Sequence, residues 1–187
     1  MACHGKIFAL WITNCTALNV MAYLTQSHNS SCIHTKGSHD IKVGGWGGTG
    51  GLEPWTFTIP NDCKLSKIRI SYNECVYSIQ FTYLNPQGRQ VNSPVYGTDW
   101  EDAKIEILPL GIGNTLTGVS GTYGQYEDLT VITSLSFRVG GKVYGPYGRN
   151  CGSTAFSLPV VKGKITGFFG NSGDYLDNLG VILAPAY

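Results

Sequence analysis

Short runs in which apolar and polar residues alternate recur along the chain from residue 41 onward. Successive side chains of a strand point to opposite faces of a sheet, so this alternation is typical of strands with one buried face. No window of helical length carries an apolar stripe with a period of 3.6 residues. We expect strands at residues 55–59, 66–70, 76–83, 103–108, 129–139, 142–144, 156–158, 164–169 and 179–183. Many short strands between turn residues predict an all-β domain with a closed or layered fold.

Three of these segments share a further pattern. A short loop leads into a strand with apolar residues at matched places in 73–81, 129–137 and 173–181. Such a repeat indicates three related β units, with three loops in comparable positions. The pair Gly140-Gly141 between two apolar runs also predicts a hairpin turn.

The composition of the chain argues against nucleic acids and membranes as binding partners. The chain has 187 residues, of which 25 are glycine and 13% are charged, and its formal net charge is +1. A basic surface strong enough to hold nucleic acid by its phosphates is therefore not expected. The apolar stretches near the start are too short and too polar to cross a bilayer, so we expect no membrane insertion.

The first part of the chain differs in character from the rest. Residues 1–39 hold all four histidines and three of the six cysteines, and we expect them to be an extension or weak leader outside the fold. The domain is then 40–187. Sequons at Asn14 and Asn29 are glycosylation acceptors only in a secreted chain. Four residues here could ligate a metal, but their spacing fits no paired-ligand motif, so no metal is expected: Cys3, His4, Cys32 and His34.

The cysteines of the domain bear on its compartment. Cys63, Cys75 and Cys151 are odd in number and widely spaced. This argues against a disulfide framework and favours a reducing compartment. We expect a cytoplasmic protein, with secretion as the alternative if residues 1–39 act as a signal segment.

Two familiar functional classes fit the sequence poorly. The run 45–50 matches the glycine pattern of dinucleotide sites, but Pro54 and a strand-like run follow it where a helix is required. No histidine occurs after His39, so a Ser-His or Cys-His nucleophile system in the domain lacks its base. Glycoside hydrolysis by carboxylate pairs stays open as a minor alternative, with pairs at 127–128 and 174/177.

The most informative segment lies near the C-terminus. Asp174 and Asp177 are the only acidic residues beyond Asp128. Gly173 allows successive amides to point into one concavity, and a carboxylate accepts hydrogen bonds from two adjacent hydroxyls. Tyr175 offers an apolar wall to C–H groups, which completes a site for a vicinal diol, that is, a sugar. The alternatives are a solvated turn and a calcium loop, although the spacing lacks the alternating oxygen ligands of calcium sites.

The chain resembles the jacalin-related plant lectins. The resemblance rests on four motifs in the family's order, at residues 41–51, 142–148, 156–159 and 164–181. It implies a β-prism of three four-stranded Greek-key sheets with the sugar site at one end. Because the chain runs on through Gly50-Gly51 and is acidic at Asp174, it is similar to the mannose/glucose-binding branch rather than to the galactose-preferring one.

The resemblance also implies a set of binding residues. The backbone amides of residues 174–176 and the carboxylate of Asp177 would hold the sugar, closed by an early glycine loop and by the loop before Leu129. The full implied set is Gly50, Gly51, Asp128, Leu129, Gly173, Asp174, Tyr175, Leu176 and Asp177. No cofactor, metal or catalytic residue is implied. The loop 73–77 lacks the matching glycine and final aspartate, so no second site of this type is expected.

These observations predict a lectin that recognises mannose/glucose-type glycans or glycoproteins reversibly and is not an enzyme. A homo-oligomer would add avidity to a weak single site. The alternative is a β-prism that acts as a protein-interaction or stress-response module with negligible sugar binding, because Glu127 and Asp128 border the site and could repel a ligand.

Overall fold

The computed structural model describes residues 18–19, 40–51, 53–111 and 113–185. The sequons at Asn14 and Asn29 and the Cys/His residues of the first 39 positions lie outside the described residues. Of that segment only β1 (Leu18–Asn19) is described, and it pairs in parallel with the edge of one sheet. No helix among the described residues is long and apolar enough to cross a membrane.

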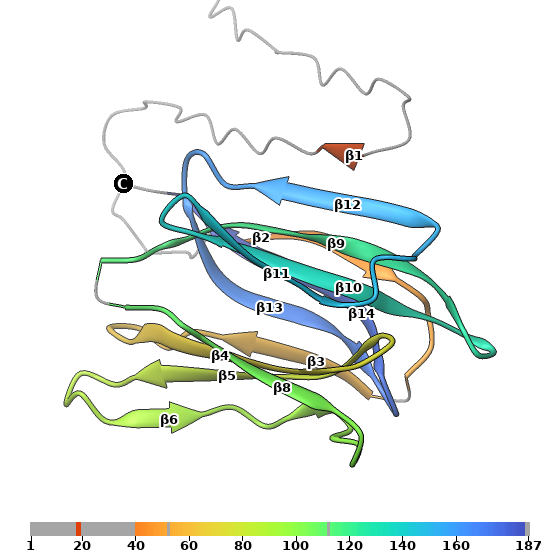
Figure 1. Ribbon diagram of the computed structural model, residues 1–187. Coiled ribbons are helices and arrows are strands. Elements are labelled where there is room, and N and C mark those ends of the chain that lie inside the picture. The colour runs from red at the N-terminus through yellow and green to blue at the C-terminus, as the bar shows by residue number, and fades with distance from the viewer. Residues whose placement is uncertain (1–17, 20–39, 52, 112, 186–187) are drawn as a thin grey trace, which may run out of the picture.

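The domain consists of three antiparallel sheets, each built on four strand positions (Figure 1). The first sheet has the order β6-β5-β4-β8, with β7 also paired to β5, and comprises β4 (Lys64–Tyr72), β5 (Val76–Leu84), β6 (Gln90–Asn92), β7 (Tyr96–Gly97) and β8 (Lys104–Pro109). The second has the order β12-β9-β10-β11 and comprises β9 (Leu116–Tyr126), β10 (Leu129–Val139), β11 (Lys142–Gly148) and β12 (Thr154–Pro159). The third has the order β2-β14-β13-β3 and comprises β2 (Ile41–Gly47), β3 (Glu53–Thr58), β13 (Lys164–Ser172) and β14 (Leu176–Ala184).

Each sheet is a Greek key. In the first two sheets, three consecutive strands form hairpins and the fourth returns to lie beside the first. The third sheet has the same spatial order but draws β2 and β3 from the start of the domain and β13 and β14 from its end. The hairpins β4–β5, β9–β10 and β13–β14 therefore occupy equivalent places, and their turns lie toward the right in Figure 1. The β-prism and the repeat expected from sequence are both present.

The predicted strands are confirmed, but β2, β9 and the short strands β6 and β7 were not predicted. Glycine obscures the alternation in β2 and β9, and β6 and β7 have only three and two residues. A methyl group on Gly121 of β9 would lie 2.9 Å from the ring of Phe156 and would also meet the carbonyl oxygen of Ser134, so the strand needs glycine to pack. In β2 the pairing skips Gly45, which forms a bulge with a φ of 90°.

The predicted hairpin between β10 and β11 is confirmed. Gly140 and Gly141 both have positive φ, at 54° and 85°. These values match the mirror-image turns that suit the right-handed twist of paired strands. Glycine takes this conformation without the steric cost that a side chain would add.

Aromatic rings hold the three sheets together. Phe81 of β5 stacks on Phe57 of β3 at 4.6 Å and on Phe168 of β13 at 4.5 Å between ring centroids. Trp46 of β2 stacks on Phe156 of β12 at 4.6 Å. One buried cluster thus joins all three sheets.

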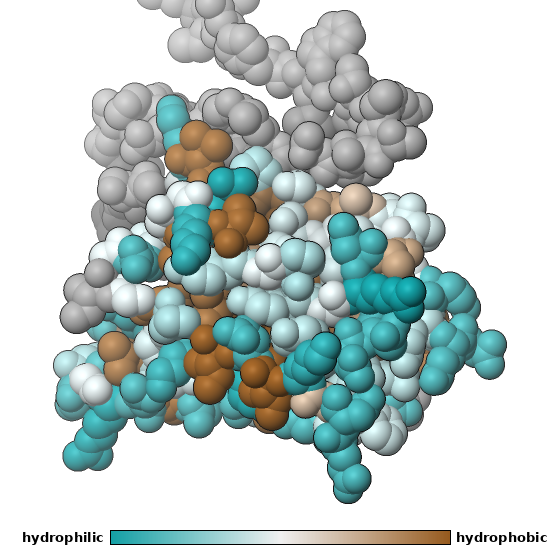
Figure 2. All heavy atoms as spheres, viewed as in Figure 1, coloured by the Kyte–Doolittle hydropathy of each residue, from teal (hydrophilic) through white to brown (hydrophobic). Residues whose placement is uncertain are grey.

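The outer surface is mostly hydrophilic or neutral in the view of Figure 2, but hydrophobic atoms gather over β8. The exposed apolar residues of this edge strand are Ile105, at 54% exposure, and Ile107, at 52%. Lys104 and Glu106 alternate with them. Charged side chains on an edge strand discourage pairing with strands of other molecules. The edge strand β8 therefore combines exposed isoleucines with charged residues that oppose such pairing.

Truncation of Phe81 should be severely destabilising. Phe81→Ala removes a fully buried ring that touches two other strands, and we expect the free energy of unfolding to fall by about 3–5 kcal/mol. Urea denaturation followed by tryptophan fluorescence measures it. Val161→Ala, at a position 60% exposed, is the matched control and should change stability by less than about 0.5 kcal/mol. Equal losses in the two variants would contradict this description of the core.

Candidate functional site

The turn between β13 and β14 forms the first part of the candidate site. The amide of Gly173 donates to the carbonyl of Tyr175 at 3.0 Å, which closes the turn. The Asp174 side chain is exposed, whereas Leu176 is fully buried in the core. Leu176 can therefore offer a ligand only its main chain, and its side chain anchors the turn to the prism.

Asp177 lies one residue into β14 and is only 2% exposed. Its carboxylate lies directly against the early glycine loop. A methyl group on Gly50 would lie 2.5 Å from Oδ1, and one on Gly51 would lie 2.7 Å from Oδ2. Gly51 also has a φ of 78°, where a side chain is strained. The loop can approach this carboxylate because it lacks side chains there.

Hydrogen bonds hold the glycine loop in place. The amide of Gly48 donates to the carbonyl of Asp177 at 3.0 Å, and the side-chain amide of Asn178 donates to the carbonyl of Gly48 at 2.8 Å. Gly48 also lies so close to the carbonyl of Thr130 in β10 that a methyl group would collide with it. Neighbouring residues of β14 thus fix the loop on one side, and β10 bounds it on another.

The turn before β10 lies at the border of this loop. Asp128 is exposed, Leu129 is 39% exposed, and the preceding Glu127 has a φ of 52°. The contact recorded between this region and the glycine loop runs through Thr130, the next residue along, against Gly48. The structure records contacts of the Asp177 carboxylate with Gly50 and Gly51, but none with Asp128 or Leu129 among the described residues.

Tyr175 packs within an aromatic group. Its ring lies 5.5 Å from that of Tyr77, 5.2 Å edge-on from Tyr126 and 6.3 Å from Trp100, measured between centroids. These partners come from the first and second sheets, so the ring ties the turn to both. Tyr175 was predicted to form a wall for the ligand; the observed role of its ring is packing against these three aromatic residues.

Two contacts were missed by sequence reasoning. Thr98 Oγ1 donates to the carbonyl of Gly173 at 3.2 Å, and Trp100 Nε1 donates to the carbonyl of Asp174 at 3.0 Å. Both donors lie in the segment between β7 and β8. They are 74–75 positions away along the chain, and nothing in the local pattern of that segment signals the contact.

Burial dominates the electrostatics of the site. Removal from water raises the pKa of the Asp177 carboxyl above its ordinary value, and the nearby charge of Asp174 adds to this. The backbone amides of Asp177 and Gly173 pull the pKa in the opposite direction without cancelling the rise. Among the described residues no cluster of three or more His, Cys, Asp or Glu side chains could hold a metal ion.

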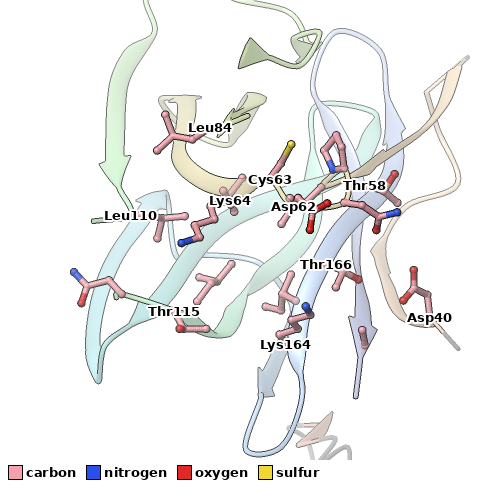
Figure 3. A pocket seen from close by; sticks show the side chains of 18 of the residues that line it. Asp40, Thr58, Asp62, Cys63, Lys64, Leu84, Leu110, Thr115, Lys164 and Thr166 are labelled. Atoms are coloured by element: carbon pink, nitrogen blue, oxygen red, sulfur yellow. The ribbon is translucent and has the colours of Figure 1, made fainter. Parts of the chain in front are cut away.

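A large hollow among the described residues lies at the end of the prism opposite the candidate site. Its volume is about 990 Å³, and it lies between the ends of β3, β5 and β14 and the starts of β4, β9 and β13 (Figure 3). Lys64, Lys164 and Asp62 are among its polar residues. None of the nine predicted site residues lines this hollow.

The raised pKa of Asp177 predicts how stability changes with pH. The folded state holds the proton more tightly than the unfolded state, so the contribution of Asp177 to stability falls as pH rises from about 3.8 through the folded pKa. The stability of the wild type relative to Asp177→Asn should fall over this window and level off above it. Urea denaturation of both proteins across pH measures the difference.

A second variant tests whether the charge of Asp174 contributes to the raised pKa of Asp177. Asp174→Asn removes the exposed charge that helps to raise the pKa, so the window should move to lower pH. Carboxyl ¹³C NMR of Asp177 follows the titration directly. A stability difference that rises with pH would show that the pKa is lowered, contrary to the structure.

Comparison with known proteins places the fold in a family. Residues 43–182 match the jacalin-like lectin domain. The chain is 34% identical over 148 residues to the mannose/glucose-specific lectin of Parkia platycephala, covering 78% of this chain and about a third (32%) of that lectin's length. It is 35% identical over 145 residues to the jacalin-related lectin Calsepa of Calystegia sepium, covering 75% of this chain and 93% of that lectin.

Solved structures of similar proteins have the same fold. The crystal structure of an artocarpin–mannotriose complex superposes with a TM-score of 0.70 at 32% identity, covering 79% of this chain and 99% of artocarpin. The crystal structure of Calystegia sepium agglutinin superposes with a TM-score of 0.70 at 34% identity, covering 79% of this chain and 97% of the agglutinin. Together with the three-sheet prism and the conjunction of Gly50, Gly51, Gly173 and Asp177, these matches show that the chain belongs to the family of jacalin-like lectin domains.

Proposed function

We propose that this domain binds mannose/glucose-type glycans reversibly at the Asp177 site, without a metal and without catalysis. The observation that carries the proposal is the buried carboxylate of Asp177, which lies against Gly50 and Gly51. Names of relatives support the choice of sugar, since the Parkia lectins are called mannose/glucose-specific and artocarpin was solved with mannotriose.

The chemistry of the site suits a ring with adjacent hydroxyls. The carboxylate accepts hydrogen bonds from two neighbouring hydroxyl groups, each stabilising the complex by roughly 1.5–3 kcal/mol as a charge-assisted bond. No described residue accepts a hydrogen bond from the amides of Asp174 and Tyr175, which leaves them as donors for ring and hydroxyl oxygens. Donors and an acceptor that converge on one ring explain how a sugar could be oriented.

We expect weak binding of a monosaccharide by one domain. We propose a dissociation constant near 1 mM, about −4 kcal/mol. Several sites presented by a homo-oligomer would raise the avidity for a branched glycan without any new contact.

The free cysteines indicate the cellular compartment in which this binding would take place. Cys63, Cys75 and Cys151 are free in the described part of the chain, and burial raises the pKa of the Cys75 thiol to about 12. We propose a reducing compartment, the cytoplasm, in which such thiols persist.

An interaction module with negligible sugar binding is the competing function. Glu127 and Asp128 border the site and carry negative charge close to the glycine loop. A glycan array that shows no ligand for a correctly folded domain would favour this alternative over the lectin function.

Removal of the carboxylate tests the proposal directly. Asp177→Ala should reduce the affinity for methyl α-mannoside by at least about tenfold, because it removes acceptors for two hydroxyls. Isothermal titration calorimetry of the full chain measures the affinity. Asp62→Ala, at the opposite end of the prism, is the matched control and should bind as the wild type does. Unchanged affinity in Asp177→Ala would refute the site.

A methyl group at Gly50 offers an independent test. Gly50→Ala keeps every polar group of the site but places Cβ 2.5 Å from Oδ1 of Asp177, so the carboxylate or the loop must move. We expect affinity for mannan to fall about tenfold or more in a surface-binding assay. Gly111→Ala is the control, since its new methyl group meets only the Asn114 side chain at the far end. Equal binding by the two variants would contradict the close approach.

A further inference from the structure

The segment between β7 and β8 contacts the candidate site from outside the predicted set of residues. Thr98 and Trp100 each donate a side-chain hydrogen bond to a main-chain carbonyl of the β13–β14 turn, those of Gly173 and Asp174 respectively. The carbonyls are consecutive, so two neighbouring peptide groups are held from the same segment. Neither donor acts on a side chain of the turn.

A carbonyl held in this way determines the direction of the next amide. In a planar trans peptide, the C=O of one residue and the N–H of the following residue point in opposite directions. The bond from Thr98 to the Gly173 carbonyl therefore directs the Asp174 N–H away from residues 98–100. The bond from Trp100 to the Asp174 carbonyl directs the Tyr175 N–H in the same way.

Residues 98–100 are themselves anchored to the first sheet. Between the two donors, Asp99 forms an ion pair with Arg69 of β4 at 2.9 Å and accepts a hydrogen bond from Ser78 of β5 at 2.6 Å. The Trp100 ring also packs near that of Tyr175, at 6.3 Å between centroids. The donors are therefore attached to a rigid β-hairpin rather than to a free loop.

We propose that Thr98 and Trp100 are positioning residues for carbohydrate binding, which hold the amides of Asp174 and Tyr175 toward the side where Asp177 and the glycine loop lie. The inference rests on the proposed lectin function and extends it to residues that need not touch the sugar. Amides already aligned lose less conformational freedom when a ligand binds, which strengthens binding without any added contact.

Three substitutions in the full chain separate this role from others. Thr98→Val removes one donor while keeping the shape of the side chain. Trp100→Phe removes the indole N–H while keeping an aromatic, although smaller, ring beside Tyr175. Thr98→Ser keeps the hydroxyl. Thr117→Val is the matched control, since it removes a similar bond from a threonine hydroxyl to the Arg138 carbonyl, away from the turn. We expect Thr98→Val and Trp100→Phe to weaken the binding of methyl α-mannoside by about two- to tenfold each. Thr98→Ser and Thr117→Val should bind as the wild type does.

Backbone dynamics give the readout that a merely structural role would not produce. In ¹⁵N relaxation without sugar, the order parameters of the Asp174 and Tyr175 amides should fall from about 0.85 toward 0.6 in the double variant Thr98→Val/Trp100→Phe. The order parameters of strand amides should stay unchanged. Weaker binding with unchanged order parameters would mean direct contact with the sugar and would overturn the inference, as would wild-type binding by the double variant.

The proposed lectin function and the proposed positioning role of Thr98 and Trp100 can be refuted independently. If the wild-type protein does not bind methyl α-mannoside at all, the proposed function is wrong. The order parameters of the turn still decide whether residues 98–100 hold its amides, because that measurement needs no ligand.

Discussion

The site depends on one close contact, that between a main chain without side chains and a buried carboxylate. Gly50 and Gly51 lie where any Cβ would collide with the oxygen atoms of Asp177. Burial of a carboxylate is costly unless polar groups compensate for the lost water, and here the backbone amides of Asp177 and Gly173 compensate in part. The absence of side chains at these glycines allows the main chain to lie directly against the carboxylate.

The same physical requirement, close approach of backbones, recurs across the prism. Gly121 in β9 makes room for the Phe156 ring, and Gly170 in β13 has no space for a methyl group beside Trp55. In both places the ring belongs to the neighbouring strand of the same sheet and lies opposite the glycine. Part of the glycine content of the chain is therefore explained by aromatic rings that lie over adjacent strands.

The sequence predicts the fold well where side chains alternate, as in β5 and β10, because burial of one face enforces that pattern. It fails for β9, whose Gly118, Gly121 and Gly124 remove the apolar signal although the strand lies inside a sheet. Asp177 and its glycines could be proposed from local residues and from the family resemblance. Thr98 and Trp100 could not, because their partners are carbonyl groups, which carry no residue identity, in a segment far along the chain.

The third sheet has a consequence for how the protein is made. Its strands β2 and β3 must wait for β13 and β14, which leave the ribosome more than 100 residues later. The first two Greek keys can collapse during synthesis, whereas β2 and β3 stay unpaired until β13 and β14 have been synthesised. The glycine loop and Asp177 belong to these two widely separated parts of the chain, so the contact between them forms only when the β13–β14 hairpin has docked against β2 and β3.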